Sequence, residues 1–513
     1  MTALADCETT ANCQPVALSD VPVLDQDDFA GHLADELHGN ASGLSALFGV
    51  PESKHSVRLY AVTNHQTTGQ LHVIATDVGE KYPSLTPSIP QAHWFEREIA
   101  EQWGVVPVGH PWLKPIRSHH SYVRGRDAWG RSPDDEILPC VQPAGTDYFK
   151  VTGDEAHEVA VGPVHAGVIE PGHFRFQCHG ENVFSLEIEL GFQHRGIEQA
   201  LIGGPDKRSL HHMETLAGDT TVGHGTAYCQ LLEGLAGVEA PLRAQAIRCV
   251  AMEYERLANH TGDLGALATD VGFLPTSSFC GRLRGDWLNA TALICGNRFG
   301  RSLARPGGSR WDIDDAMAEE LVKRTQAAFR DVTGAVELLW STTTVMARFE
   351  GCGEVPRDVA DDLGLVGMAG RACGIDRDAR RDFPFGIYRF AQVPVGVWHT
   401  GDVFARAYVR WLEIQRSVPF ILDQLQALPR GDVQRDIGLL QPDALTVSIT
   451  EGWRGEICHV AITDSESRFA HYKIVDPSFH NWIGLAMALR NQEISDFPVN
   501  NKSFNLSYCG HDL

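Results

Sequence analysis

The chain has 513 residues, of which 43% are apolar and 21% are charged, a globular composition that excludes wholesale disorder. It carries 43 Lys and Arg against 66 Asp and Glu, a net charge of −23, so nucleic acid and anionic lipid surfaces would repel it. At roughly 100–200 residues per domain, the length predicts two to four domains.

No stretch of about 18 uncharged apolar residues occurs, so the sequence predicts no transmembrane helix. The first 29 residues have neither the basic nor the apolar region of a secretory signal. We therefore expect a cytoplasmic protein that contacts a membrane only through partner proteins.

The N-terminal part of the chain predicts a small α/β domain over residues 31–115. The preceding residues 1–30 are polar, and we expect them to be frayed or loosely docked. Alternating apolar residues predict paired strands at Ser56–Thr63 and Leu71–Thr76. A helix is predicted over Ala92–Trp103, ended by the glycine that follows it.

Residues 116–150 are rich in Arg, His, Gly, Pro and Asp, which indicates a linker before a second domain at 151–513. The second domain is predicted to open with three strands, to be mainly helical from about 206 to 425, and to return to short strands between 445 and 474. The predicted fold class is therefore α+β, with a small α/β domain followed by a mainly helical domain with small β-sheets.

Twelve cysteines are scattered along the chain, and none forms a C-x-x-C pair. Iron–sulfur clusters and structural zinc sites usually need two such pairs, so we expect mostly buried, reduced thiols and no cofactor bound by this chain. The sequence also lacks a G-x-G-x-x-G motif and a Walker loop, so it predicts neither a Rossmann NAD site nor a P-loop.

Residues that could take part in proton transfer lie on one loop and at one helix end of the second domain. His165 and His173 lie between its first two strands, where an imidazole can exchange a proton near neutral pH, but loop histidines often have no such role. Asp270 ends a long helical stretch, and Asp263 lies seven residues earlier on roughly the same face. Either carboxylate can instead bond to nearby backbone.

Several short motifs, taken together, are more specific than any one of them. They are Tyr82–Pro87, Trp94–Glu98 and Gly109–Pro111, then Gly162–His165, Gly191–Glu198, Pro241–Gln245, Asp270–Gly272, Gly401–Arg406, Arg454–Glu456 and Pro477–Phe479. The first three resemble the C subunit of bacterial NADH–quinone oxidoreductase (respiratory complex I), and the later ones resemble its D subunit. The same fused arrangement occurs in the large subunits of group 4 [NiFe] hydrogenases, such as that of formate hydrogenlyase.

The resemblance implies where a [NiFe] centre would be held, by four thiolates from two C-x-x-C pairs. The positions that match the first pair hold Ala217 and Thr220, and those that match the second hold Ser507 and Gly510. Cys509 is adjacent but has no partner thiolate. We therefore expect no [NiFe] centre and no metal ligands here.

In the D subunit of complex I the vacated cavity binds the quinone head group, and the resemblance implies the same use here. The quinone-site histidine matches His165 and its partner aspartate matches Asp270, so we expect both to be catalytic, with His165 the proton donor and Asp270 orienting it. The quinone-site tyrosine falls at or next to Gly218, so no phenol is expected at that position. The expected acceptor-binding residues are His165, Ala217, Gly218, Thr220 and Asp270.

The resemblance thus implies a peripheral oxidoreductase subunit on the inner face of the cell membrane. The complex to which it belongs would bind NAD and quinone. Its partners would be a small iron–sulfur subunit that holds a [4Fe-4S] cluster and antiporter-like membrane subunits. Quinone is the possible substrate.

Three alternatives remain open. The chain can be a non-redox scaffold or coupling subunit, or a genuine group 4 [NiFe] hydrogenase large subunit. It can also be a nickel enzyme with the non-thiolate ligands Asp219, His224 and His511.

Overall fold

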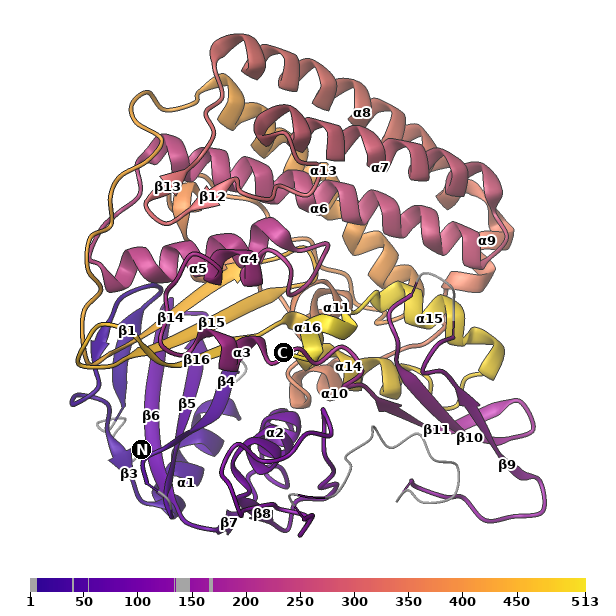
Figure 1. Ribbon diagram of the computed structural model, residues 1–513. Helices are drawn as coiled ribbons and strands as arrows, with labels where there is room; N and C mark the ends of the chain where they lie inside the picture. The colour runs from indigo at the N-terminus through magenta and orange to yellow at the C-terminus, as the bar shows by residue number, and fades with distance from the viewer. Residues whose placement is uncertain (1–6, 39–40, 54, 133, 135–147, 166–168) are drawn as a thin grey trace.

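The computed structural model describes residues 7–513 apart from 39–40, 54, 133, 135–147 and 166–168. Among the described residues, three β-sheets of three to five strands, two small two-stranded sheets and a layer of long helices make up an α+β fold, as the sequence predicts. In Figure 1 the N-terminal sheet lies at the lower left, the long helices lie at the top, and a second sheet lies between them.

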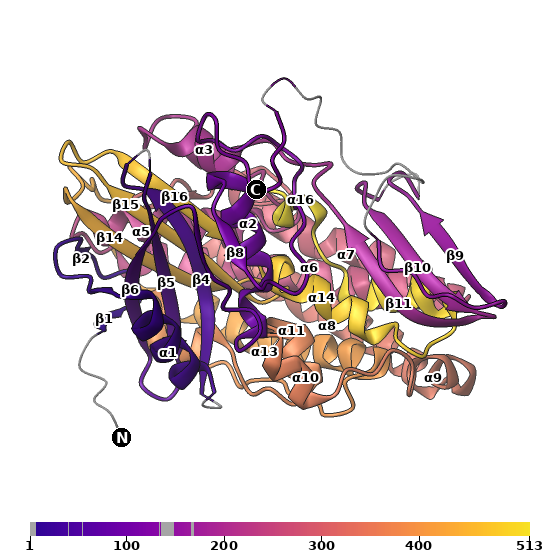
Figure 2. The same ribbon diagram turned by 90° about the horizontal axis from the view of Figure 1, so that it is seen from below.

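The N-terminal sheet has five strands, with α1 and α2 beside it (Figure 2). α1 begins where the Asp25 carboxylate accepts a hydrogen bond from the Asp28 N–H (2.8 Å), and α2 ends at Gly104, whose φ is 64°. The elements of this part are β1 (Glu8–Ala11), β3 (Val23–Leu24), α1 (Gln26–Leu37), β4 (Ser42–Pro51), β5 (Val57–His65), β6 (Gln70–Val78), β7 (Lys81–Pro83), η1 (Pro90–Ala92), α2 (His93–Trp103) and β8 (Val106–Val108).

The prediction of a loosely docked segment over residues 1–30 is wrong for the part that the structure describes. β1 pairs with β6, whereas β2 (Val16–Ala17) pairs with β14 in the sheet of the second domain. The Asn12 side chain also exchanges hydrogen bonds with the backbone of Ile449 (2.9 and 2.8 Å). Backbone hydrogen bonds therefore hold this polar segment in place, and its composition does not predict them.

The second domain contains a four-stranded sheet in the order β16-β15-β14-β2 and a three-stranded sheet in the order β11-β10-β9. The four-stranded sheet packs on the N-terminal sheet, and one apolar core contains residues from both, including Leu47, Val62, Val447 and Val460. The strands are β9 (Ala156–Val161), β10 (His173–His179), β11 (Asn182–Glu189), β12 (Ala304–Arg305), β13 (Gly308–Ser309), β14 (Ala444–Glu451), β15 (Glu456–Thr463) and β16 (Phe469–Val475).

The helical layer is built on α6, which is buried on most sides because α7 and α13 pack against it. The other helices connect this layer to the sheets. The helices are α3 (Ile197–Leu201), α4 (Ser209–Met213), α5 (Thr221–Leu235), α6 (Leu242–Asp270), α7 (Leu274–Cys295), α8 (Asp315–Ser341), α9 (Thr343–Phe349), α10 (Arg357–Asp362), α11 (Gly367–Ala372), α12 (Ala379–Asp382), η2 (Gly386–Arg389), α13 (Val403–Gln426), α14 (Pro477–Ala488), η3 (Ile494–Asp496), α15 (Phe497–Phe504) and α16 (Tyr508–His511).

The predicted linker at 116–150 lies partly outside the described residues. Its described start, 116–132, contains neither helix nor strand. Arg117 in this stretch is buried, pairs with Glu98 (2.7 Å) and donates a hydrogen bond to the backbone oxygen of His511 (3.1 Å). The stretch therefore ties the small domain to the C-terminal end of the chain, which lies in the middle of the molecule (Figure 1).

Candidate functional site

The turn before α5 carries three of the predicted acceptor-binding residues, but they face different surroundings. Ala217 is buried in an apolar cluster, whereas Gly218 has open space where a side chain would lie. Thr220 is buried, and its hydroxyl accepts hydrogen bonds from Trp453 Nε1 (3.2 Å) and Arg454 Nη1 (3.3 Å). The three residues therefore do not line one common surface.

The C-terminal turn around α16 carries the other two positions that match thiolate ligands. The Ser507 hydroxyl caps α16 by accepting a hydrogen bond from the Gly510 N–H (2.9 Å). A Cβ atom added to Gly510 would lie 2.6 Å from Asp476 Cγ and 2.8 Å from its Oδ1. The Asp476 carboxylate thus occupies the space that a cysteine side chain would need at this position.

Asp476 is held in place by a buried polar chain that starts at this point. It accepts hydrogen bonds from the Ser478 N–H (2.8 Å), which caps α14, and from His224 Nε2 (2.9 Å). His224 Nδ1 lies 3.0 Å from His459 Nε2, and His459 Nδ1 lies 2.9 Å from the Tyr472 hydroxyl. One assignment of the protons gives all four imidazole nitrogens a hydrogen-bond partner. In it Tyr472 donates to His459, His459 donates to His224, and His224 donates to Asp476.

The pKa shifts agree with this assignment. Burial alone would raise the pKa of Asp476, but its hydrogen bond with His224 and the charge of Arg454 outweigh burial and lower it. Burial holds the pKa of His459 well below its ordinary value. Asp476 is therefore the anion at the end of the chain, and His459 is neutral.

Arg454 joins the two turns that match the ligand pairs. Its guanidinium contacts both carboxylate oxygens of Asp219 (2.6 and 2.8 Å), and its Nε donates to the backbone oxygen of Asn505 (2.6 Å). The Asn505 amide donates to Asp263 (2.6 Å), which also pairs with Arg410 (2.8 Å). Asp263 thus belongs to a buried ion pair and bonds to side chains, rather than to nearby backbone.

The structure places His165 beside the C-terminal turn. Its Nε2 lies 3.3 Å from the Tyr508 hydroxyl, and burial lowers the pKa of the imidazole. Burial raises the pKa of the Tyr508 phenol, so this phenol is protonated at neutral pH. Tyr508 lies between the two positions that match ligands, Ser507 and Gly510, so a phenol contacts the predicted catalytic histidine, although it comes from a different segment than the one around Gly218.

Asp270 ends α6, as predicted, and is exposed. Its neighbours partly desolvate it and raise its pKa, and the charge of Lys502 opposes that shift. Within the described part of the chain, no hydrogen bond or ion pair joins Asp270 to His165. The two predicted catalytic residues are therefore not brought into contact, and their roles stay predictions.

The second predicted loop histidine, His173, begins β10 and is buried. Its Nδ1 lies 3.3 Å from the backbone oxygen of Gly162. The three possible nickel ligands each pair with a different residue. Asp219 pairs with Arg454, His224 with Asp476, and His511 with Asp512 (3.0 Å). Each of these three side chains therefore already has its own partner, and the expectation of no [NiFe] centre stays a prediction.

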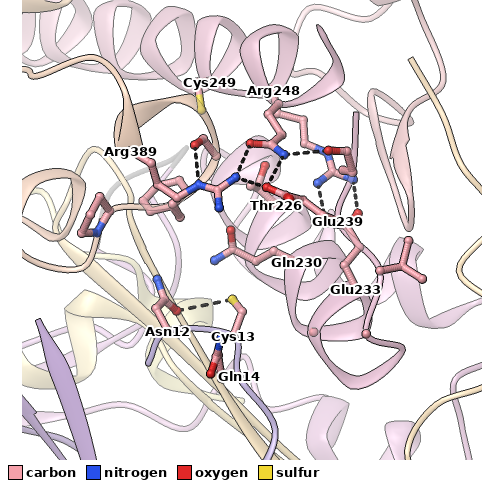
Figure 3. A pocket seen from close by; sticks show the side chains of 18 of the residues that line it. Asn12, Cys13, Gln14, Thr226, Gln230, Glu233, Glu239, Arg248, Cys249 and Arg389 are labelled. Carbon is pink, nitrogen blue, oxygen red and sulfur yellow. Dashed lines mark hydrogen bonds and ion pairs between the residues drawn. The ribbon is translucent and has the colours of Figure 1, made fainter. Parts of the chain in front are cut away.

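A pocket of about 390 Å³ lies elsewhere, between the segment that joins β1 to β2, α5 and the start of α6 (Figure 3). Its two arginines are paired, Arg248 with Glu233 (2.6 Å) and Arg389 with Glu239. Burial raises the pKa of the Cys13 thiol in this pocket to about 12, so the thiol is protonated. None of the predicted acceptor-binding residues lines this pocket.

Comparison with known proteins agrees with the resemblance. Residues 21–126 match the model of the respiratory-chain NADH dehydrogenase 30 Kd subunit, and residues 270–441 match that of the 49 Kd subunit. Formate hydrogenlyase subunit 5 of Escherichia coli is 29% identical over 89% of this chain and 82% of its own length. The C/D subunit of the NADH-quinone oxidoreductase of Bdellovibrio bacteriovorus is 24% identical over 87% of this chain and 86% of its own length.

The alpha subunit of the membrane-bound hydrogenase of Pyrococcus furiosus is 27% identical over 67% of this chain and 84% of its own length. Among the described helices, none is long and apolar enough to cross a membrane. Both domain models match within one chain, and the relatives come from both complex I and hydrogenases. The chain therefore belongs to the family of oxidoreductase subunits in which the 30 Kd and 49 Kd domains of respiratory NADH dehydrogenase are fused, a family that it shares with the formate hydrogenlyase and hydrogenase-4 large subunits.

Proposed function

We propose that this chain is a peripheral subunit of a membrane-bound oxidoreductase and takes part in electron transfer to a quinone-type acceptor without a [NiFe] centre. One observation carries the proposal: the turn that would supply two metal thiolates holds Ser507 and Gly510 instead, and Tyr508 between them bonds to His165 (3.3 Å). The contact supports the proposal because it joins two side chains that can donate protons at a turn that matches a ligand pair of the hydrogenases.

The chemistry of quinone reduction explains why this pair is suited to the task. Reduction to a hydroquinone adds two electrons and two protons, and each carbonyl oxygen becomes a hydroxyl. Because the pKa of Tyr508 is raised, the phenol holds its proton at neutral pH. The pKa of His165 is lowered by burial, so its imidazole needs a nearby anion to carry a second proton, which is the role proposed below for Asp270. Both groups can hydrogen-bond to a carbonyl oxygen and donate a proton as negative charge develops on it.

The electrons would come from a small iron–sulfur partner that holds a [4Fe-4S] cluster, because this chain has no cysteine motif for one. Antiporter-like membrane subunits would hold the complex on the inner face of the cell membrane. Asp270 would stabilise the charged form of His165. Since no bond joins the two in the described residues, this role requires an acceptor-bound complex in which they approach.

The test uses the intact complex with a soluble quinone analogue. We expect His165→Ala and Tyr508→Phe each to lower turnover by about 100-fold or more, with the complex still assembled, because general acid catalysis contributes about 10²–10⁴-fold. His157→Ala, on exposed β9, is the matched control and should leave turnover unchanged. Unchanged turnover in both variants would refute the role of the pair.

A metal analysis tests the other half of the proposal. We expect the complex, purified without added metal, to contain no nickel, and iron only at the level of the partner clusters. About one nickel per chain would refute the proposal and favour the hydrogenase alternative.

A non-redox scaffold is the second candidate, and a specific observation favours it. The Asp476 carboxylate fills the space beside Gly510, and Ala217 is buried in the core, so polar and apolar side chains close part of the vacated ligand region. The His165 and Tyr508 variants separate the two candidates, because a scaffold predicts normal function of the complex in both.

A further inference from the structure

A cluster of metal-binding side chains lies in the N-terminal domain, far along the chain from the site already described. At its centre is Glu36 on α1, whose side chain is only 3% exposed. Its Oε1 lies 2.6 Å from His72 Nδ1, 3.2 Å from His32 Nε2 and 3.4 Å from His65 Nε2. The Cys7 sulfur completes a group in which the ligand atoms of Cys7, Glu36 and His72 all lie within 4.8 Å of one another.

The strand register explains why these residues meet. Residues directly opposite in antiparallel strands share a face, and so do residues two apart along one strand. His72 lies opposite Thr9 on β1 and opposite Thr63 on β5. Cys7, two residues before Thr9, and His65, two after Thr63, are therefore on the sheet face that α1 covers.

The charge balance of the cluster leaves a place for a cation. The described ion pairs of Glu36 involve only histidines, and none involves Lys or Arg. His65 Nε2 is buried and has no hydrogen bond of good geometry. A buried carboxylate that lacks a Lys or Arg partner among the described residues and an unsatisfied imidazole nitrogen thus face the same point.

The donor types and spacings select the class of metal. Around a tetrahedral ion with bonds of about 2.0–2.3 Å, donor atoms lie about 3.3–3.8 Å apart, close to the spacings from Glu36 to His32 and His65. Thiolate and imidazole donors suit zinc, whereas magnesium and calcium prefer oxygen donors alone.

We propose that Cys7, Glu36 and His72 bind one Zn²⁺ ion, with His65 as the nearest fourth donor. The ion would replace the short hydrogen bond between Glu36 and His72 by two metal–ligand bonds. It would also tie the start of β1 to α1 and to the β5–β6 hairpin, which is a structural role separate from electron transfer. The proposal does not depend on the function proposed above.

The experiment uses the full chain, free of any histidine tag, stripped with a chelator and titrated with zinc chloride. We expect one zinc ion per chain, and affinity at least about 100-fold weaker in Glu36→Gln and His72→Gln, since even outer-shell substitutions cost 10–100-fold. His55→Ala, an exposed histidine of the same domain, is the matched control and should bind zinc as the unaltered chain does.

Cobalt substitution keeps the test decisive if a buried-residue variant fails to fold. Cys7 is only half-buried, so Cys7→Ser should fold. With Co²⁺, the unaltered chain should show a thiolate-to-cobalt charge-transfer band, and Cys7→Ser should lose it. The proposal is overturned if the unaltered chain binds no zinc, if Glu36→Gln and His72→Gln both fold and bind it equally well, or if the band persists in Cys7→Ser.

Discussion

Gly510 offers a direct test of why the C-terminal turn has no room for a metal thiolate. Gly510→Ala adds a single methyl group whose carbon would lie 2.6, 2.8 and 2.9 Å from the three carboxyl atoms of Asp476. Asp476 cannot move freely, because it caps α14 and accepts a hydrogen bond from the buried His224. Either the methyl group is accommodated by strain or the carboxylate shifts and loses this bond.

The magnitude follows from these two routes. Overpacking a well-packed site costs about 1–3 kcal/mol, and losing a hydrogen bond to a charged group costs about 1.5–3 kcal/mol. We therefore expect Gly510→Ala to lower the free energy of unfolding by about 1–3 kcal/mol. The backbone itself adds nothing, because Gly510 lies in α16 and is not among the residues with positive φ. Gly218→Ala, where no atom lies within 4 Å of the new carbon, should cost less than about 0.5 kcal/mol.

A double-mutant cycle isolates the contact between Gly510 and Asp476. Asp476→Ala alone should cost about 2–4 kcal/mol, because it removes the cap of α14 and the partner of His224. In that background no carboxylate collides with the new methyl group, so Gly510→Ala should cost less than about 0.5 kcal/mol. The assay is urea unfolding of the purified chain, followed by tryptophan fluorescence. Additive costs would refute the steric argument, and so would a Gly510→Ala variant as stable as the unaltered chain.

Two further predictions concern buried charges. Glu413 accepts hydrogen bonds from Arg256 (2.9 Å), Arg371 (2.7 Å) and His260 (2.8 Å). Glu413→Gln removes this buried negative charge but leaves Arg256 paired with Glu253 (3.2 Å) and Arg371 paired with Glu451 (2.8 Å), so it should cost about 1.5–3 kcal/mol in urea unfolding. Glu320→Gln, which breaks an exposed pair with Arg324, should cost less than about 1 kcal/mol, and equal losses would contradict the argument. Burial and the charge of Lys473 lower the pKa of His471 from 6.5 to about 3, although the charge of Glu98 opposes this shift. The neutral His471 therefore contributes fully to the free energy of unfolding above pH 6.5, and this contribution is lost as the pH falls toward 3. His471→Leu should reduce the loss of stability between pH 8 and pH 5 by about 2 kcal/mol relative to the unaltered chain, and an unchanged pH profile would refute this.

The sequence alone determined those features that depend on neighbours along the chain. Apolar alternation placed β5 and β6, and the helical period with its terminal glycine placed α2 and its end at Gly104. The long helix α6 ends at Asp270, as predicted. The motifs carried the family resemblance, which the comparisons confirm, because a motif keeps its residue types wherever the chain folds.

Only the tertiary structure decided which distant residues meet. Tyr508 lies 343 positions from His165, and sequence reasoning missed it, although it lies within a C-terminal segment rich in polar and aromatic residues. The anchoring of residues 7–30, the collision of Gly510 with Asp476 and the cluster around Glu36 were equally invisible. The physical reason is that local pattern fixes which face of an element is buried, whereas the packing of whole sheets and helices decides what that face touches.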